Sequence, residues 1–153
     1  MIRDDIKAAV ITAMKGGDKA RTGTIRLIQS ALKNRDIELR GAANPPADDD
    51  ALVVEVLQKM IKQRRESIAM YETGGRAELA ANEQAEVEVI ESFLPRQMSE
   101  DEAKAAIDAI VTDTGAASVK DMGRVMAVLK ERHASALDMS KASALVKARL
   151  SEG

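Results

Sequence analysis

Apolar residues recur at steps of three and four along almost the whole chain, and this period limits the possible folds more than any other feature. The first two such stretches run from Ile2 to Met14 and from Thr24 to Leu39. Steps of three and four place apolar side chains on one face of an α-helix, whereas a half-buried strand would alternate every second residue. The sequence therefore predicts an all-α protein, and no stretch of it predicts a strand.

Glycine and proline divide the periodic stretches into separate helices. Gly16-Gly17-Asp18 separates the first two, and a predicted loop from Gly41 to Pro46 precedes a third helix that begins near Asp50. That helix ends at Gly74-Gly75, and a fourth helix returns from there toward Pro95. The first half of the chain is thus expected to fold as antiparallel helices.

Pro95 marks a boundary between two groups of helices. Proline cannot donate the next helical hydrogen bond and disfavours a helical conformation in the residue before it, so the fourth helix must end there. We therefore expect an N-terminal antiparallel helical domain over residues 1–95. A small three-helix C-terminal domain would cover residues 96–153.

Three serines predict where the helices of the second half begin. Ser99 and Glu102 match the Ser-x-x-Glu capping box, in which each side chain accepts a hydrogen bond from the backbone of the other residue. Ser118 is expected to cap the next helix and Ser140 the last one, because a serine hydroxyl can accept from the free amides of a first helical turn.

The composition narrows the possible functions. The 23 Lys and Arg residues against 25 Asp and Glu residues give a net charge of -2, so any affinity for nucleic acid must come from a local basic patch. One Phe, one Tyr and no Trp leave almost no rings on which unpaired bases could stack. The lack of cysteine removes disulfides and thiolate metal sites, and it fits a cytoplasmic location.

The sequence carries none of the familiar motifs of independent catalysis. It contains no glycine-rich phosphate loop, no His-x-x-x-His spacing and no nucleophile elbow. No apolar run approaches the roughly 20 residues that span a bilayer. We therefore expect no metal, no cofactor and no membrane partner, and the sequence does not support catalysis by this chain alone.

One group of charges falls on the apolar faces of the third and fourth helices. An antiparallel hairpin about Gly74-Gly75 places residue 64 opposite residue 85, so Arg64 is expected between Glu83 and Glu86. A general base needs a raised pKa, which a neighbouring guanidinium opposes. The three residues therefore predict a structural polar cluster, in which a buried ion pair fixes the register of the hairpin.

The alternative interpretation of the same region is an RNA-binding groove. Lys62, Arg65 and Arg76 would form its exposed cationic rim. Solvated basic helix faces are commoner than RNA sites, so this pattern is weakly specific.

A glycine inside the predicted sixth helix gives a second candidate site. Glycine in a helix interior costs about 1 kcal/mol relative to alanine, so Gly123 needs a reason. Either it allows close packing against a neighbouring helix of the chain, or it lets an RNA or protein partner approach between Lys120 and Arg124. Lys141 and Lys147 on the last helix are further candidates for phosphate contacts.

Several segments together resemble the YqeY family. In the first half they are Thr24-Ile25-Arg26-Leu27, Ile61-Lys62-Gln63-Arg64 and Phe93-Leu94-Pro95. In the second half the resemblance continues through Asp121-Met122-Gly123-Arg124-Val125-Met126. Members of this family are similar to the helical tail of GatB, the tRNA-binding subunit of glutamine-dependent tRNA amidotransferase.

The resemblance implies a tRNA-associated helical adaptor without a reactive centre of its own. It would be accessory to a carbon-nitrogen ligase that uses glutamine as amido donor, and an amidotransferase label would describe only this context. tRNA or a tRNA-handling enzyme is the implied partner, and DNA is not expected. Where family members carry a Gly-Arg-Ala-Asp-Gly turn before the last helix, this chain departs from the pattern and reads Ser135-Ala136-Leu137-Asp138-Met139.

An interaction protein unrelated to tRNA is the alternative. In that case the helix from Met122 to Met126 would present its methionines as a groove for a helix of a partner protein. Binding that survives Lys120→Glu and Arg124→Glu would favour this alternative.

Overall fold

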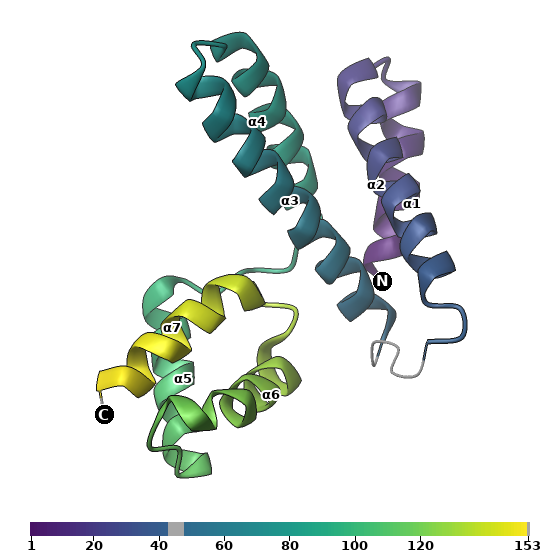
Figure 1. Cartoon of the computed structure of the whole chain (residues 1–153). Helices are drawn as coiled ribbons and strands as arrows, with labels where there is room; N and C mark the ends of the chain where they lie inside the picture. Colours follow the sequence, from purple (N-terminus) through teal and green to yellow (C-terminus); the bar gives the residue numbers. More distant parts are fainter. Residues whose placement is uncertain (43–47, 153) are drawn as a thin grey trace. The chain divides into compact units, whose positions relative to one another are not determined.

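The computed structural model describes residues 1–42 and 48–152, and within them every regular element is helical (Figure 1). The elements are α1 (Ile2–Lys15), α2 (Lys19–Glu38), α3 (Asp49–Thr73), α4 (Ala77–Glu91), α5 (Glu100–Thr114), the 3₁₀ turn η1 (Val119–Asp121), α6 (Met122–His133) and α7 (Met139–Glu152). The predicted all-α class is confirmed. The loop predicted from Gly41 to Pro46 lies largely outside the described residues.

The chain divides into two compact units, Met1–Leu94 and Pro95–Gly153. Each unit has an apolar core of its own. The independent folding of each part, which the word domain implies, stays a prediction. No helix of the described residues is long and apolar enough to cross a membrane.

Two antiparallel helical hairpins, α1–α2 and α3–α4, build the N-terminal unit (Figure 1). Asp18 begins α2 because its carboxylate accepts a hydrogen bond of 3.0 Å from the amide of Arg21. Asp48 begins α3 in the same way, by accepting from the amide of Ala51 at 2.7 Å. Gly75 reverses the α3–α4 hairpin with a φ of 72°, a left-handed conformation that favours glycine. Polar caps thus fix where α2 and α3 begin, and a glycine turn fixes where the chain reverses between α3 and α4.

The apolar faces of all four helices meet in one core. Its most deeply buried members are Ile6, Ile25, Ile28, Val53, Leu57, Val87 and Ile90. Because every helix of the unit contributes to this core, the two hairpins are held against each other, and charged residues near it have fixed neighbours.

The C-terminal unit begins with the predicted capping box on α5. The hydroxyl of Ser99 accepts from the amide of Glu102 at 3.2 Å, and the carboxylate of Glu102 accepts from the amide of Ser99 at 3.3 Å. Gly115 ends the helix with a φ of 67°, and its amide donates to the carbonyl of Val111. Ser99 and Glu102 therefore fix the start of α5, as the sequence indicates, and Gly115 fixes its end.

Of the two other predicted helix starts, the one at Ser118 is confirmed in position and the one at Ser140 is not. Ser118 is the N-cap residue of the 3₁₀ turn η1, which leads directly into α6, and the carboxylate of Asp121 accepts from the amides of Ala117 and Ser118 at 2.9 and 3.3 Å. Ser140 is not the cap of α7, since the helix begins at Met139 and the Asp138 carboxylate accepts from the Ser140 amide at 2.8 Å. In both places an aspartate two to four residues from the free amides accepts their hydrogen bonds.

Candidate functional site

Arg64 of α3 lies between two carboxylates of α4. Its Nε donates to Oε2 of Glu86 at 2.9 Å, and Oε2 of Glu83 lies 4.0 Å from the same nitrogen. Its Nη1 donates to the carbonyl of Met60, one turn earlier, at 3.3 Å. The structure thus brings together the three residues of the expected polar cluster.

The cluster is partly buried rather than buried. The side chain of Arg64 is 15% exposed, whereas those of Glu83 and Glu86 are 26% and 32% exposed. Two of the three guanidinium nitrogens already donate within the protein. These bonds hold the guanidinium in place between α3 and α4, so the geometry favours a structural role.

Of the three cations expected around this cluster, Lys62 and Arg65 lie one turn apart on α3, and Arg76 lies beyond the Gly74-Gly75 turn. Arg65 is half exposed, but its Nη2 donates to Oε1 of Glu91 at 2.7 Å and its charge is thereby balanced. Lys62 is exposed on α3, and Arg76 is exposed just before α4. The stretch of α3 between Lys62 and the turn is about 16 Å long, so a ligand that contacts both Lys62 and Arg76 would have to extend along the hairpin, and the cationic rim stays a prediction.

Gly123 lies on an open surface at the start of α6. A Cβ atom built on it meets no atom within 4 Å. The expectation of close packing against a neighbouring helix is therefore wrong for the described residues. Lys120 in η1 and Arg124 in α6 are both exposed beside this glycine.

Asp121 places a negative charge between these two cations. Hydrogen bonds from the amides of Ala117 and then Ser118 lower the pKa of the Asp121 carboxyl, and the charge of Arg124 lowers it further. Nη2 of Arg124 lies 3.3 Å from its Oδ1. A ligand that approaches this turn at neutral pH therefore meets two cations and one anion.

Lys141 and Lys147 are exposed on α7 and form no ion pair within residues 1–42 and 48–152. Six residues separate them, which is about 120° around a helix and about 9 Å along it. They therefore point to different sides of α7, and only an extended ligand such as a nucleic-acid backbone could contact both.

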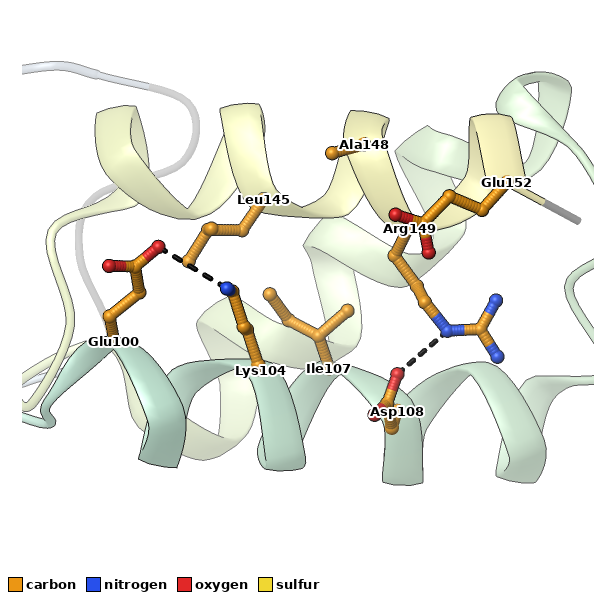
Figure 2. A pocket seen from close by; sticks show the side chains of 8 residues that line it. All are labelled: Glu100, Lys104, Ile107, Asp108, Leu145, Ala148, Arg149 and Glu152. Carbon is orange, nitrogen blue, oxygen red and sulfur yellow. Dashed lines mark hydrogen bonds and ion pairs between the residues drawn. The ribbon is translucent and has the colours of Figure 1, made fainter.

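A groove between α5 and α7 was not expected from the sequence (Figure 2). Ile107 and Leu145 point into it from the two helices, and its volume is about 480 Å³. Two ion pairs lie along it: Lys104 with Glu100 at 3.4 Å, and Arg149 with Asp108 at 2.7 Å. The groove thus has an apolar floor and charged edges of both signs.

A cluster of charges around Arg3 was also missed. Its Nη1 lies 3.1 Å from Oδ2 of Asp36, and its Nη2 lies 2.9 Å from Oδ1 of Asp49. The hydrogen bond that Arg3 donates to Asp49 lowers the pKa of Asp49, and the same bond, with further ones that Arg3 donates to Asp36, raises the pKa of Arg3. The cluster ties the start of α1 to the end of α2 and the start of α3. Elsewhere in the described residues, as here, no three histidine, aspartate or glutamate side chains gather as metal ligands would.

Comparisons with known proteins give one family match and several similar proteins. The model of the family described as Yqey-like protein matches residues 3–150. The protein named "Altered inheritance of mitochondria protein 41, mitochondrial" from Saccharomyces cerevisiae is 29% identical over 126 residues, which are 78% of this chain and 64% of the yeast protein. The protein of the same name from Lachancea thermotolerans is 30% identical over 112 residues, 73% of this chain and 54% of the relative. This chain therefore spans less than two thirds of the length of these relatives.

Proposed function

Because this chain belongs to the family of Yqey-like proteins, we propose that it is a helical adaptor that associates with tRNA and leaves the chemistry to a partner enzyme. Three lysines of the C-terminal unit carry the proposal: Lys120, Lys141 and Lys147 are exposed and form no ion pair in the described residues. Structured RNA is recognised largely through its shape and phosphates, which suits cations that have no aromatic neighbours for stacking.

Arg124 would add a fourth contact by exchanging partners. Its side chain is 55% exposed, and its bond to Asp121 joins two residues three positions apart on the surface. Solvent screens an exposed pair of this kind, so a phosphate can replace the carboxylate at little cost. Lys62, Arg65 and Arg76 belong to the other unit, and Arg65 would first have to leave Glu91.

We further propose that the partner enzyme is a carbon-nitrogen ligase with glutamine as amido donor, as the resemblance to the GatB tail implies. The cytoplasmic location stays a prediction. The names of the yeast relatives contain the word mitochondrial, so imaging of a tagged chain in its native cell would decide between the two compartments.

Filter binding of tRNA at 50 and 200 mM salt tests the proposal. Each phosphate contact contributes about 0.7–0.9 to the slope of log affinity against log salt, so three to four contacts predict an affinity about 20- to 150-fold weaker at the higher concentration. An acidic helical protein of similar size is the control. Affinity for tRNA that equals that of the control at both salt concentrations would refute the proposal.

A second candidate function, binding to a protein unrelated to tRNA, is favoured by the α5–α7 groove. The expected methionine groove has less support, because Met122 and Met126 are half-buried against the core of their own unit. Ala148 lines the α5–α7 groove and is exposed. A partner protein that copurifies with the wild type but not with Ala148→Glu, in the absence of tRNA affinity, would favour this candidate.

A further inference from the structure

The outer surface of the α1–α2 hairpin combines cations with exposed apolar side chains. Steps of four and three place one set on a single side of α2: Lys19, Gly23, Arg26, Ser30 and Lys33. The same steps place another set on a single side of α1: Lys7, Ile11 and Met14. Nη2 of Arg26 lies 3.6 Å from Sδ of Met14, which joins the two sets into one surface. We call these eight exposed residues the α1–α2 face.

The hairpin is basic although the chain as a whole is acidic. Residues 1–42 hold nine Lys and Arg against five Asp and Glu, a net charge of +4, so with -2 for the whole chain the remainder carries -6. Three of the five acids serve the fold, two as partners of Arg3 and Arg35 and one as the cap of α2. The other two, Asp4 and Asp5, lie in the first turn of α1. None of the cations of the face forms an ion pair in the described part of the chain.

Apolar side chains lie among these cations. Ile11 is 52% exposed and Met14 is 53% exposed, and Leu27 beside the face is 47% exposed. Single exposed apolar residues are common on proteins. Here, however, they adjoin cations without ion-pair partners in the described residues. The face therefore offers both positive charge and apolar area, which an amphipathic ligand needs.

Gly23 adds a low point in the middle of the face. Its conformation is not left-handed, and a Cβ atom built on it meets nothing within 4 Å. Glycine in a helix interior costs about 1 kcal/mol relative to alanine, and no contact inside the described chain offsets this cost. An antiparallel hairpin that reverses at Gly17 places Ile11 opposite Gly23. A missing side chain at such a position lets the backbone of a second helix come close.

We propose that the α1–α2 face binds an acidic amphipathic helix of a partner protein. Carboxylates of that helix would pair with Lys7, Arg26 and Lys33, and its apolar stripe would cover Ile11 and Met14 while its backbone passes over Gly23. RNA would use the cations but leave the apolar side chains exposed. A lipid surface would take a wider apolar face with larger side chains. An acidic amphipathic helix would contact the cations, the exposed apolar side chains and the surface over Gly23 together.

Fluorescence anisotropy with the full chain and a synthetic helical peptide tests the proposal. The probe is a labelled peptide of about 18 residues, or five turns, with leucine at steps of three and four and glutamate on the flanks. The control peptide has the same composition in an order that scatters the leucines around the helix. The proposal predicts binding of the first peptide and an affinity for the second that is weaker by about tenfold or more. Equal binding of both peptides, or of neither, would overturn it.

Variants of the chain locate the binding. Lys7→Glu with Arg26→Glu is expected to weaken binding of the acidic peptide by about tenfold or more. Gly23→Leu should weaken it similarly by blocking the approach, and since leucine favours helix, the variant should fold at least as well. Lys59→Glu with Lys130→Glu makes the same change of charge elsewhere and should leave binding unchanged. An equal loss in this control would overturn the proposal.

Two further measurements distinguish an acidic helix from two other possible ligands of this face, RNA and a second copy of the chain. If Lys7→Glu with Arg26→Glu and Gly23→Leu lower affinity for tRNA but not for the peptide, the face binds RNA and the proposal falls. If sedimentation velocity shows that the wild type self-associates and Gly23→Leu is a monomer, a second copy of the chain is the occupant, and the proposal falls in that case too. The proposal does not depend on tRNA binding by the C-terminal unit, so either can fail alone.

Discussion

At the scale of single residues, Arg64 illustrates how a charge on an apolar helix face can hold two helices in register. Its side chain is 15% exposed, and the hydrogen bond to Glu86 offsets the loss of hydration. Removal of the guanidinium would leave two partly buried carboxylates, Glu83 and Glu86, without the cation between them. Breaking such a pair costs more than the pair contributes, because the remaining charges keep their desolvation penalty.

Arg64→Met is therefore expected to lower the free energy of unfolding by about 1–3 kcal/mol, less than for a fully buried pair because water reaches both carboxylates. The matched control is Arg65→Met, which removes a bond of 2.7 Å to Glu91 from a side chain that is 50% exposed. Its expected cost is about 0–1 kcal/mol. Urea unfolding measures both. An unchanged unfolding midpoint for Arg64→Met, together with loss of tRNA affinity, would assign Arg64 to a binding site instead.

The bond between Arg3 and Asp49 predicts how the free energy of unfolding changes as the pH falls. Its hydrogen bond lowers the pKa of Asp49 below the ordinary 3.8, so this bond stabilises the folded chain above that pH and the contribution disappears as the pH falls through the lowered pKa. Arg3→Met should thus destabilise the chain at pH 7, by about 1 kcal/mol after allowance for solvent screening. At about pH 2.5, below the ordinary carboxyl pKa, the difference between variant and wild type should shrink. A difference that is equal at the two pH values would contradict this account.

At the scale of the elements, two glycines of the C-terminal unit have opposite roles. Gly115 holds the left-handed conformation that ends α5, whereas Gly123 lies in a helix without any contact for a side chain. Gly115→Ala should lower the free energy of unfolding by about 1 kcal/mol, and Gly123→Ala should raise it by about 0.5–1 kcal/mol. Thermal unfolding followed by circular dichroism measures both. If Gly123→Ala were destabilising, a contact at that position would have to exist.

The sequence was sufficient for features that depend on neighbours along the chain. The helical period predicted the fold class, and counting outward from Gly74-Gly75 placed Arg64 opposite its acids. Contacts over longer separations could not be found in this way: Arg3 and Asp49 are 46 residues apart, and their meeting depends on how two hairpins pack. Arg149 and Asp108, at the α5–α7 groove, are 41 residues apart.

The residue that caps α7 could not be predicted from the sequence either. Asp138 and Ser140 are both good caps. Which of them acts depends on a shift of one residue in the start of α7, and the period of apolar residues does not define a helix end that closely.

At the scale of the whole molecule, the chain forms two compact units with separate cores, and each carries one of the proposed binding surfaces. The α1–α2 face belongs to the first unit, and the lysines proposed to contact tRNA belong to the second. Residues 95–153, expressed alone, should fold cooperatively around Ile107, Leu129 and Val146, all buried to within 1%. A unit of this size is expected to unfold with about 3–8 kcal/mol. Dispersed amide signals in an NMR spectrum would confirm the fold, whereas a spectrum of an unfolded chain would contradict independent folding.

The salt dependence of tRNA binding, compared between two triple variants of the full chain, tests the central claim most directly. One variant carries Lys120→Gln, Lys141→Gln and Lys147→Gln. The control carries Lys15→Gln, Lys59→Gln and Lys130→Gln, which remove the same charge from other exposed positions. The slope of log affinity against log salt should fall by about 2–3 in the first variant, because three phosphate contacts are lost, and should stay that of the wild type in the control. Equal slopes for both variants and the wild type would contradict the assignment of this chain as a tRNA adaptor that binds through its C-terminal unit.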